Sequence, residues 1–370
     1  MKQKVAIIGG GIMGASLAYF LGTLPGGEQV DVTLYDSGIG QATSNAAGII
    51  SPWLSKRRNQ QWYQLAKDGA TLLIQLSREA NLSNDIYQQT GTIVTRSDEA
   101  DLQLLLQTAQ SRQQDAPDMG TIELLSATDV QERIPLLTHA QPGIFISGGA
   151  RIDGAAFVTE LLRQAQTKNL TFLPEQVTLN ATGDIIRSAG IKHFDTVVVL
   201  AGARTADVLK PLGVTAKVRP QKGELIELNV KDYPTLENMP VLMPEGERDF
   251  IPFGHGKLIV GATHDDEGGF DLSRSQAVET DLLASAQRFD ADLTADNIAQ
   301  VKIGTRAYTA DFAPFFGQVP QHPNVYVASG LGSSGLTTGP VISRLLANKI
   351  LYGLDANWGR YTKPTNIYFD

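Results

Sequence analysis

The sequence predicts an α/β fold that combines a parallel sheet with a second, mostly antiparallel α+β part. Three observations predict it. Residues 4–14 join an apolar strand to a Gly-x-Gly-x-x-Gly turn, the β-run at residues 196–200 is continuously apolar after Thr196, and several β-runs joined by short turns lie within residues 217–274. An apolar strand suits a parallel sheet that is covered on both faces, whereas short turns join antiparallel neighbours. No internal repeat or low-complexity linker separates these segments, so we expect the two sheets to be interleaved along the chain.

The first 36 residues have the order of a Rossmann-like βαβ unit that holds a dinucleotide. Gly9, Gly11 and Gly14 follow the first apolar strand, a helical stretch comes next, and a second β-run ends at Asp36. Gly9 permits the tight turn, Gly11 lets the backbone approach a pyrophosphate, and Gly14 lets helix and strand pack closely. A glycine motif alone is weak evidence, but strand, motif, helix, strand and acid in this order are specific.

Asp36 narrows the choice of dinucleotide. A carboxylate at the end of the second strand can accept hydrogen bonds from both hydroxyls of an adenosine ribose. An acid at this position argues against a 2′-phosphate, so the sequence favours FAD or NAD over NADP.

Composition restricts the class of protein further. The chain has 370 residues and a formal net charge of −8, which disfavours nucleic-acid binding because that requires a basic surface. It has no cysteine, which excludes disulfides, thiolate metal sites and a cysteine-linked flavin, and which fits a reducing cytoplasm. The first strand begins near the start and no apolar run approaches the length of a membrane span. We therefore expect a cytoplasmic protein without a signal peptide or membrane span.

Hydrophobic periodicity predicts the helices, and short β-rich runs bounded by turn residues predict the strands. In residues 61–79, for example, Leu65, Leu72 and Leu76 fall on one helical face. The other expected helices are residues 99–112, 128–133, 153–168, 276–289 and 340–351. The expected strands after the first two are residues 91–95, 143–146, 172–173, 176–179, 196–200, 224–228, 250–253, 257–261 and 325–329.

Two loops rich in small residues have the composition of ligand-binding loops. Residues 37–52 follow the second strand, and residues 330–339 precede the last helix. Backbone amides and hydroxyls in such loops can contact a ligand closely, although plain surface loops have the same composition. The acidic run at residues 264–267, which includes one histidine, predicts no metal site, because adjacent turn residues rarely point at one ion.

These segments resemble the D-amino-acid oxidase and glycine/sarcosine oxidase family of flavoproteins, and the resemblance runs nearly end to end. The first and last glycine segments recur in many flavoproteins, whereas the segments between them are more specific in this order. The resemblance is carried by residues 9–14, Asp36, 42–49, Val177, 197–202, 221–224, 260–263, 305–317 and 330–340.

The resemblance implies FAD, with its pyrophosphate at the first glycine turn and its ribose on Asp36. The 42–49 segment would approach the pyrophosphate and the flavin, the Val177 backbone would approach the adenine, and the 331–337 loop would lie against the isoalloxazine ring. The expected cofactor-binding residues are Gly9, Gly11, Ile12, Met13, Gly14, Asp36, Ser37, Ala42, Thr43, Ser44, Ala47, Gly48, Ile49, Val177, Ala201, Gly202, Gly330, Leu331, Gly332, Ser333, Ser334, Gly335, Leu336 and Thr337.

The resemblance also implies a discontinuous domain layout and a mode of cofactor attachment. The FAD-binding domain would comprise residues 1–80, 148–216 and 301–370, and the substrate domain residues 81–147 and 217–300. We expect FAD to be bound non-covalently. The chain has no cysteine, and its first histidine, His139, lies far beyond the N-terminal segment in which relatives form histidyl links.

The family reaction is the oxidation of a small amine or amino acid. Hydrogen on the α-carbon leaves as hydride to flavin N5, and the imine then hydrolyses, which requires geometry more than an acid or a base. Arg306 matches the family arginine that holds the substrate carboxylate in a planar, bidentate clamp. Tyr308 stands where relatives have a small residue, and either lines the pocket or packs between the domains. We expect Arg306 and Tyr308 at the catalytic site, and O2 or another carrier as electron acceptor.

The chain departs from glycine-oxidase-type relatives at two substrate contacts. Those relatives have a tyrosine before the Ile-x-Pro strand, where this chain has Asp249 and Phe250. They also have an arginine in the last glycine loop, where this chain has Ser333. These differences argue against glycine itself as the substrate.

Three alternative functions stay open at this point. One is an FAD-dependent 2-hydroxy-acid dehydrogenase of the same fold. Another is a nicotinamide dehydrogenase built on the same βαβ unit, against which the 42–49 and 331–339 segments argue. The third is a flavin-binding subunit without turnover, against which Arg306 argues.

Overall fold

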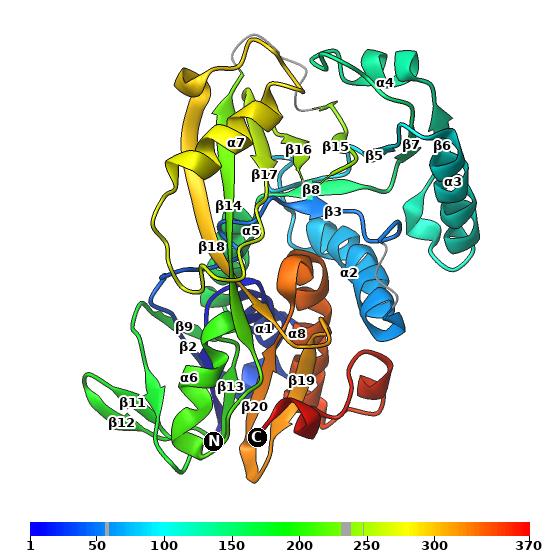
Figure 1. Cartoon of the computed structure of the whole chain (residues 1–370). Helices are drawn as coiled ribbons and strands as arrows, with labels where there is room; N and C mark the ends of the chain where they lie inside the picture. The colour runs from blue at the N-terminus through cyan, green and yellow to red at the C-terminus, as the bar shows by residue number, and fades with distance from the viewer. Residues whose placement is uncertain (56–58, 231–237, 247) are drawn as a thin grey trace.

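Two large sheets organise the computed structural model, which describes residues 1–55, 59–230, 238–246 and 248–370. The parallel sheet and the N-terminus lie in the lower half of the view in Figure 1, and the antiparallel sheet with its helices lies in the upper half. Strands of the two sheets alternate along the chain, and both kinds of pairing are present. The predicted fold class is therefore confirmed.

The first sheet has the strand order β19-β20-β13-β1-β2-β9. Strand β1 is central and pairs in parallel with β2 on one side and β13 on the other. Ligands of open α/β sheets bind at the carboxyl ends of the strands where the order changes direction, which here lies between β1 and β13. The bounds are β1 (Gln3–Ile8), β2 (Val30–Tyr35), β9 (Leu170–Leu173), β13 (Thr196–Val199), β19 (Phe315–Val319) and β20 (His322–Ser329).

Four helices pack together on one face of this sheet. Helix α1 is buried continuously from Ile12 to Leu21 because α5 and α8 both pack against it, and α2 packs on α8. The opposite face is covered by a small sheet of three strands and by α6. The bounds are α1 (Ile12–Thr23), α2 (Gln60–Glu79), α5 (Gly154–Gln166), α6 (Thr205–Leu209), α8 (Gly335–Tyr352), β10 (Thr178–Leu179), β11 (Ile185–Arg187) and β12 (Gly190–Lys192).

The second sheet has the order β18-β14-β17-β16-β15-β5-β7-β6, and all its pairs are antiparallel except β15 with β5. One face packs against α7 and α4 through residues such as Leu228 and Phe250, whereas the other face carries Leu225 and Ile251. The bounds are β5 (Thr92–Thr95), β6 (Ile122–Leu125), β7 (Gly143–Ile146), β14 (Arg219–Asn229), β15 (Val241–Met243), β16 (Asp249–Pro252), β17 (Lys257–Gly261), β18 (Ile298–Tyr308), α3 (Glu99–Gln113), α4 (Ala127–Arg133) and α7 (Gln276–Ala286).

A third, three-stranded sheet lies beside β16 of the second sheet. It consists of β3 (Ile49–Ile50), β8 (Ala150–Ile152) and β4 (Tyr87–Gln88). Arg151 on β8 is only 1% exposed, and its guanidinium donates hydrogen bonds to the Pro252 carbonyl and to Gln88 Oε1. The bond to Pro252 joins the small sheet to β16, whereas Gln88 lies on β4 of the small sheet itself.

Short 3₁₀ turns complete the described elements. They are η1 (Gly27–Gln29), η2 (Pro117–Met119), η3 (Gly202–Arg204), η4 (Lys210–Leu212), η6 (Ala295–Asn297), η7 (Gly332–Ser334), η8 (Trp358–Arg360) and η9 (Thr365–Tyr368). Across the described residues, no helix combines the length and the apolar character needed to cross a membrane.

The main error in the expected elements concerns the last glycine-rich loop. Residues 335–339 are the first turns of α8, so this helix starts at Gly335 and Pro340 lies inside it. Proline usually marks a helix start because it lacks an amide proton. Here the small residues before Pro340 let α8 approach α1 closely, since a Cβ at Gly339 would lie 3.0 Å from Ile12 Cγ2. The strand expected at residues 176–179 also shrinks to Thr178–Leu179.

Candidate active site

A cavity of about 1130 Å³ is lined by residues of both large sheets. The carboxyl ends of β1, β2, β13 and β20 border it from one side, and the face of the antiparallel sheet that carries Leu225 borders it from the other. This is the position at which the strand order of the parallel sheet predicts a ligand.

The first glycine turn brings bare backbone to this cavity. Gly9 has a φ of 110°, which L-residues rarely adopt, and a Cβ at Gly14 would clash with the Gly9 carbonyl. Gly9 and Gly11 line the cavity, whereas Gly14 supports the turn from behind. The first amide of α1, that of Ile12, donates to Thr43 Oγ1 at 3.0 Å. A helix N-terminus reached by a glycine turn fits a pyrophosphate, because its amides and dipole favour negative charge.

Asp36 stands at the end of β2 and borders the same cavity. Its Oδ2 accepts hydrogen bonds from the Gly10 amide and from Gln41 Nε2, the latter at 2.9 Å, and its Oδ1 accepts one from the Gly38 amide. These donors hold the Asp36 carboxylate beside the glycine turn, where the ribose of a dinucleotide would lie.

Most of the expected cofactor-binding residues line this cavity. The exceptions are Gly14, described above, and Ser44, whose hydroxyl donates to Gln41 Oε1 at 3.0 Å. The expected residues that line the cavity are Gly9, Gly11, Ile12, Met13, Asp36, Ser37, Ala42, Thr43, Ala47, Gly48, Ile49, Val177, Ala201, Gly202, Gly330, Leu331, Gly332, Ser333, Ser334, Gly335, Leu336 and Thr337.

Tyr308 was expected at the catalytic site, but it is not among the cavity-lining residues. The side chain is buried behind the last glycine segment, and a Cβ at Gly332 would clash with its ring. The Ser333 amide donates to the Tyr308 hydroxyl at 3.2 Å, and Phe312 packs edge-on against the ring. The geometry therefore favours the alternative of a packing aromatic, which holds the 330–334 segment in place.

Arg306 lies on β18 and borders the cavity with a largely buried guanidinium. Its Nη1 donates to Gln221 Oε1 at 3.0 Å and to the Thr263 carbonyl at 2.8 Å. Burial lowers the pKa of the guanidinium, although an arginine remains protonated at any ordinary pH. Within the described ranges, no carboxylate lies within ion-pair distance of Arg306 and neither Nη2 nor Nε has a protein acceptor. The arginine can therefore receive an anion from the cavity.

Sequence reasoning noted Asp249 as a departure but missed it as a site residue. Asp249 lines the cavity from β16, whereas its neighbour Phe250 points to the opposite face and stacks on Phe289 at 5.0 Å between ring centroids. Burial raises the pKa of the Asp249 carboxyl to about 7. The two-residue period of a strand is the signal that separates Asp249 from Phe250, because Ile251 and Asp249 share the face opposite Phe250.

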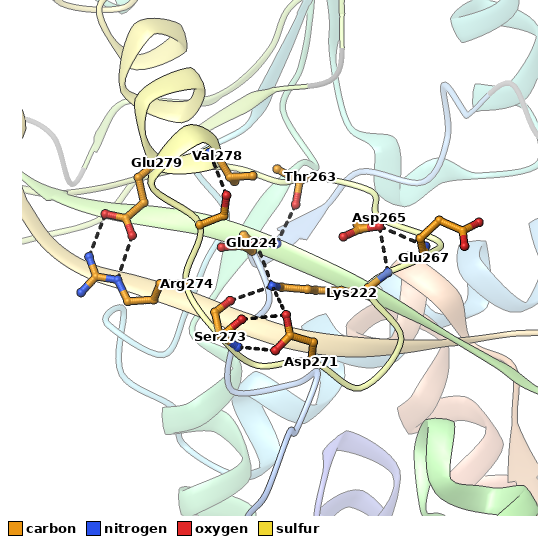
Figure 2. Close-up of polar contacts among 12 residues, drawn as sticks. Lys222, Glu224, Thr263, Asp265, Glu267, Asp271, Ser273, Arg274, Val278 and Glu279 are labelled. Atoms are coloured by element: carbon orange, nitrogen blue, oxygen red, sulfur yellow. Dashed lines mark hydrogen bonds and ion pairs between the residues drawn. The ribbon is translucent and has the colours of Figure 1, made fainter.

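A buried polar cluster on the opposite face of β14 fastens the loop that follows β17 (Figure 2). Lys222 Nζ donates to the Ser273 carbonyl at 2.7 Å and to Asp271 Oδ2 at 3.2 Å, and it lies 3.3 Å from Glu224 Oε1. The same loop carries Phe270 and Leu272 to the rim of the cavity. The cluster thus positions part of the cavity wall. Among the residues that the structure describes, no three His, Asp or Glu side chains are grouped so that they could hold a metal ion.

Comparison with known proteins decides the family. The model of the DAO family, described as FAD dependent oxidoreductase, matches residues 4–349. The chain belongs to this family of FAD-dependent oxidoreductases. The predicted family is therefore confirmed, and the glycine turn, Asp36 and the long cavity are consistent with its cofactor.

Similar proteins include several oxidoreductases of this family. The uncharacterized oxidoreductase YurR of Bacillus subtilis (strain 168) is 36% identical over 362 residues, which cover 95% of each chain. The glycine oxidase of Pseudomonas putida (strain KT2440) is 25% identical over 366 residues, 94% of each chain. The crystal structure of iminodiacetate oxidase (IdaA) from Chelativorans sp. BNC1 superimposes with a TM-score of 0.89, at 31% identity and over 98% of each chain.

Proposed function

We propose that this protein oxidises a small amine or amino acid whose carboxylate is held by Arg306. The observation that carries the proposal is the state of the guanidinium, which is largely desolvated, borders the cavity and has no carboxylate partner in the described chain. A buried cation without a counter-ion is costly, and a substrate carboxylate would offset that cost. The names of two relatives, a glycine oxidase and an iminodiacetate oxidase, support a substrate with an amine and a carboxylate.

FAD, when bound, would supply the oxidant that takes up the hydride equivalent of the α-carbon. The first glycine turn and Asp36 would hold its pyrophosphate and ribose. The 42–49 segment would approach the pyrophosphate and the flavin, and the 331–337 loop would lie against the isoalloxazine ring. We also propose that FAD is held non-covalently, because the chain contains no cysteine. Yellow colour that stays with the chain after acid precipitation would contradict this. The electron acceptor, in this proposal, is O2 or another carrier.

The side chains around the cavity would position the substrate. Gln221 and the Thr263 carbonyl fix the guanidinium of Arg306, which leaves the rest of its planar fork for a carboxylate. Positioning of this kind can supply much of the rate enhancement when the reacting carbon is held close to the hydride acceptor.

We further propose that the two sheets correspond to two domains, with the FAD domain formed by residues 1–80, 148–216 and 301–370 and the substrate domain by residues 81–147 and 217–300. The boundary proposed at residue 301 falls inside β18 (Ile298–Tyr308). This strand belongs to the antiparallel sheet, and its last residues border the cavity. Arg306 lies near the end of that strand, and in this proposal it borders both domains.

The experiment that tests the function is an anaerobic screen of flavin bleaching. Purified protein is mixed without oxygen with glycine, N-methylglycine, proline, iminodiacetate, amines that lack a carboxylate, and 2-hydroxy acids. We expect at least one amine with a carboxylate to reduce the flavin, and amines without a carboxylate to be much poorer. Reduction only by 2-hydroxy acids would favour the dehydrogenase of that class, and reduction by none would favour a flavin-binding subunit.

A further inference from the structure

The cavity contains a second charged group, besides Arg306, to which the proposed binding of a substrate carboxylate gives no role. Asp249 borders it from β16, and within the described residues its side chain has no hydrogen-bond or ion-pair partner. Its surroundings on this face of the sheet are apolar and include Leu225 and Ile251. An uncompensated carboxylate in such a place destabilises the fold, and a compensating group can reach it only from the cavity.

Strand register places Asp249 close to the Arg306 site. Asp249 is the register partner of Gly261 on β17, and Thr263, two residues further along, accepts the hydrogen bond from Arg306. Asp249, which can bind a cation, and Arg306, which can bind an anion, therefore border one cavity from the same end of the sheet. This is the arrangement that a zwitterion requires, with opposite charges a few bonds apart.

The other charged groups that line this part of the cavity do not neutralise Asp249. The Glu245 carboxylate is occupied by the amide and hydroxyl of Ser97, and Arg96 donates to the Thr95 carbonyl. No described cation lies within ion-pair distance of Asp249. The charged or titratable groups lining the cavity from the neighbouring elements are Arg96, Asp101, Glu245, His264 and Arg306, and nearer the first glycine turn Asp36, Glu175, Arg204 and Asp207.

We propose that Asp249 binds the protonated amine of the substrate and accepts one of its protons, so that the site takes zwitterionic amino acids with a primary or secondary amine. The inference rests on the proposed function and assigns its substrate class. In the step, an N–H bond of the ammonium breaks, an O–H bond forms on Asp249, and the electron pair stays on nitrogen. The neutral amine can then donate that pair as hydride leaves the α-carbon. No oxidant or reductant takes part in the proton transfer itself.

The pKa of the Asp249 carboxyl suits a proton acceptor. Burial raises the pKa of the Asp249 carboxyl to about 7, whereas an ordinary aspartate has a pKa near 3.9 and would be a weak proton acceptor. Efficient acid–base groups have a pKa close to the working pH. The same carboxylate disfavours 2-hydroxy acids, because a hydroxyl offers it no positive charge.

Pairs of ligands that differ only at the amine provide the test. N-methylglycine is compared with methoxyacetate, and proline with tetrahydrofuran-2-carboxylate, in which an ether oxygen replaces the ammonium. Dissociation constants come from the concentration dependence of anaerobic flavin reduction for the amines, and from perturbation of the flavin absorbance for the ethers, which requires no turnover. The variants are Asp249→Asn, of nearly the same shape, and Glu245→Gln as a control acid on the same cavity.

Asp249→Asn is expected to weaken binding of the amines by roughly 10- to 150-fold, the range of a hydrogen bond to a charged group, and to change ether binding by less than about threefold. The pH dependence of flavin reduction near 7 should disappear in Asp249→Asn and persist in Glu245→Gln. Three results would overturn the assignment of Asp249. They are equal effects of the substitution on amine and ether binding, no effect on either, and failure of both amines to bind the parent. If Arg306 variants lose carboxylate binding while Asp249→Asn behaves like the parent, only this inference fails and the proposed function stands.

Discussion

The guanidinium of Arg306 lies over Gly223, so that a Cβ at residue 223 would stand 2.8 Å from its Cζ atom. The two residues are near neighbours on paired strands, because Gly223 is opposite Gly304 and Gln221 is opposite Arg306. The missing side chain at residue 223 is what leaves room for the guanidinium to lie flat between the sheet and the cavity.

Gly223→Ala should therefore displace Arg306 without removing it. A misplacement on the order of 1 Å can cost about 100-fold in rate, so we expect the rate constant of flavin reduction over substrate affinity to fall by roughly 10- to 100-fold. Stopped-flow reduction measures it. Gly359→Ala is the matched control, since a Cβ there meets no atom of the described residues within 4 Å. A parent-like Gly223→Ala enzyme would show that the guanidinium does not need this space.

Asp36→Ala should weaken FAD binding, because it removes an ionised acceptor at the end of β2. Hydrogen bonds to charged groups contribute about 1.5–3 kcal/mol, which corresponds to roughly 10- to 150-fold in affinity. Titration of the apo-protein with FAD, followed by flavin fluorescence, measures the dissociation constant. Asp31→Ala is the control, because Asp31 is on the same strand but its side chain is 60% exposed and pairs with Lys2. An unchanged FAD affinity in Asp36→Ala would place the ribose elsewhere.

Local sequence patterns were sufficient for the elements whose structure depends on neighbouring residues. The glycine turn after β1, the amphipathic helix α2 and the strand β17 are found where periodicity and turn residues placed them. The sheet formed by β3, β8 and β4 was not predicted, because its strands have two or three residues and pair with partners that are distant in the sequence, such as Ile49 with Arg151 and Tyr87 with Ile152. The early start of α8 was missed because the small residues before Pro340 read as a loop, and only close packing against α1 makes them helical.

The residues of the candidate site also differ in whether the sequence could predict them. Glycines and Asp36 could be found from spacing, since their role depends on a local turn. The orientation of Tyr308 could not, because it is determined by contacts with Gly332 and Ser333, which lie more than twenty residues away. Asp249 was not predicted as a site residue because the observation that identifies it is the lack of a compensating cation among the described residues around it. That observation requires the neighbouring strands to be in place.

Lys222→Met should destabilise the protein by leaving Glu224 buried without its cation. The two side chains are 5% and 4% exposed, and removing one partner from a buried pair costs about 3–5 kcal/mol. The double variant Lys222→Met/Glu224→Leu should recover much of this loss, because an apolar pair carries no desolvation cost. Lys217→Met is the control, since the Lys217–Asp370 pair is exposed and worth roughly 0–1 kcal/mol. Urea unfolding of the apo-proteins measures all three, and equal losses in the single and double variants would contradict the account.

Asp249→Asn should increase thermal stability, and more so at higher pH. The pKa of Asp249 is raised to about 7 in the folded protein, whereas an unfolded aspartate has a pKa near 3.9. Between these values the folded state binds a proton that the unfolded state does not, so the parent loses stability as pH rises from about 4 to about 7. Asparagine does not titrate, so the difference in Tm between variant and parent should grow over this range and level off above it. A difference that does not vary with pH would show that Asp249 ionises normally.

The central claim is that Arg306 holds the substrate carboxylate, and Arg306→Ala tests it most directly. Rapid mixing of the variant with its best amine substrate, without oxygen, gives the rate constant of flavin reduction over substrate affinity. We expect this ratio to fall by about two to four powers of ten, since a desolvated partner is removed, while the flavin spectrum stays unchanged. Arg306→Lys should recover little, because an ammonium cannot form the planar fork. Arg274→Ala should behave like the parent, because the Arg274 side chain is 62% exposed and pairs only at the surface with Glu279. An Arg306→Ala enzyme that oxidised its carboxylate substrate as well as the parent would contradict the assignment.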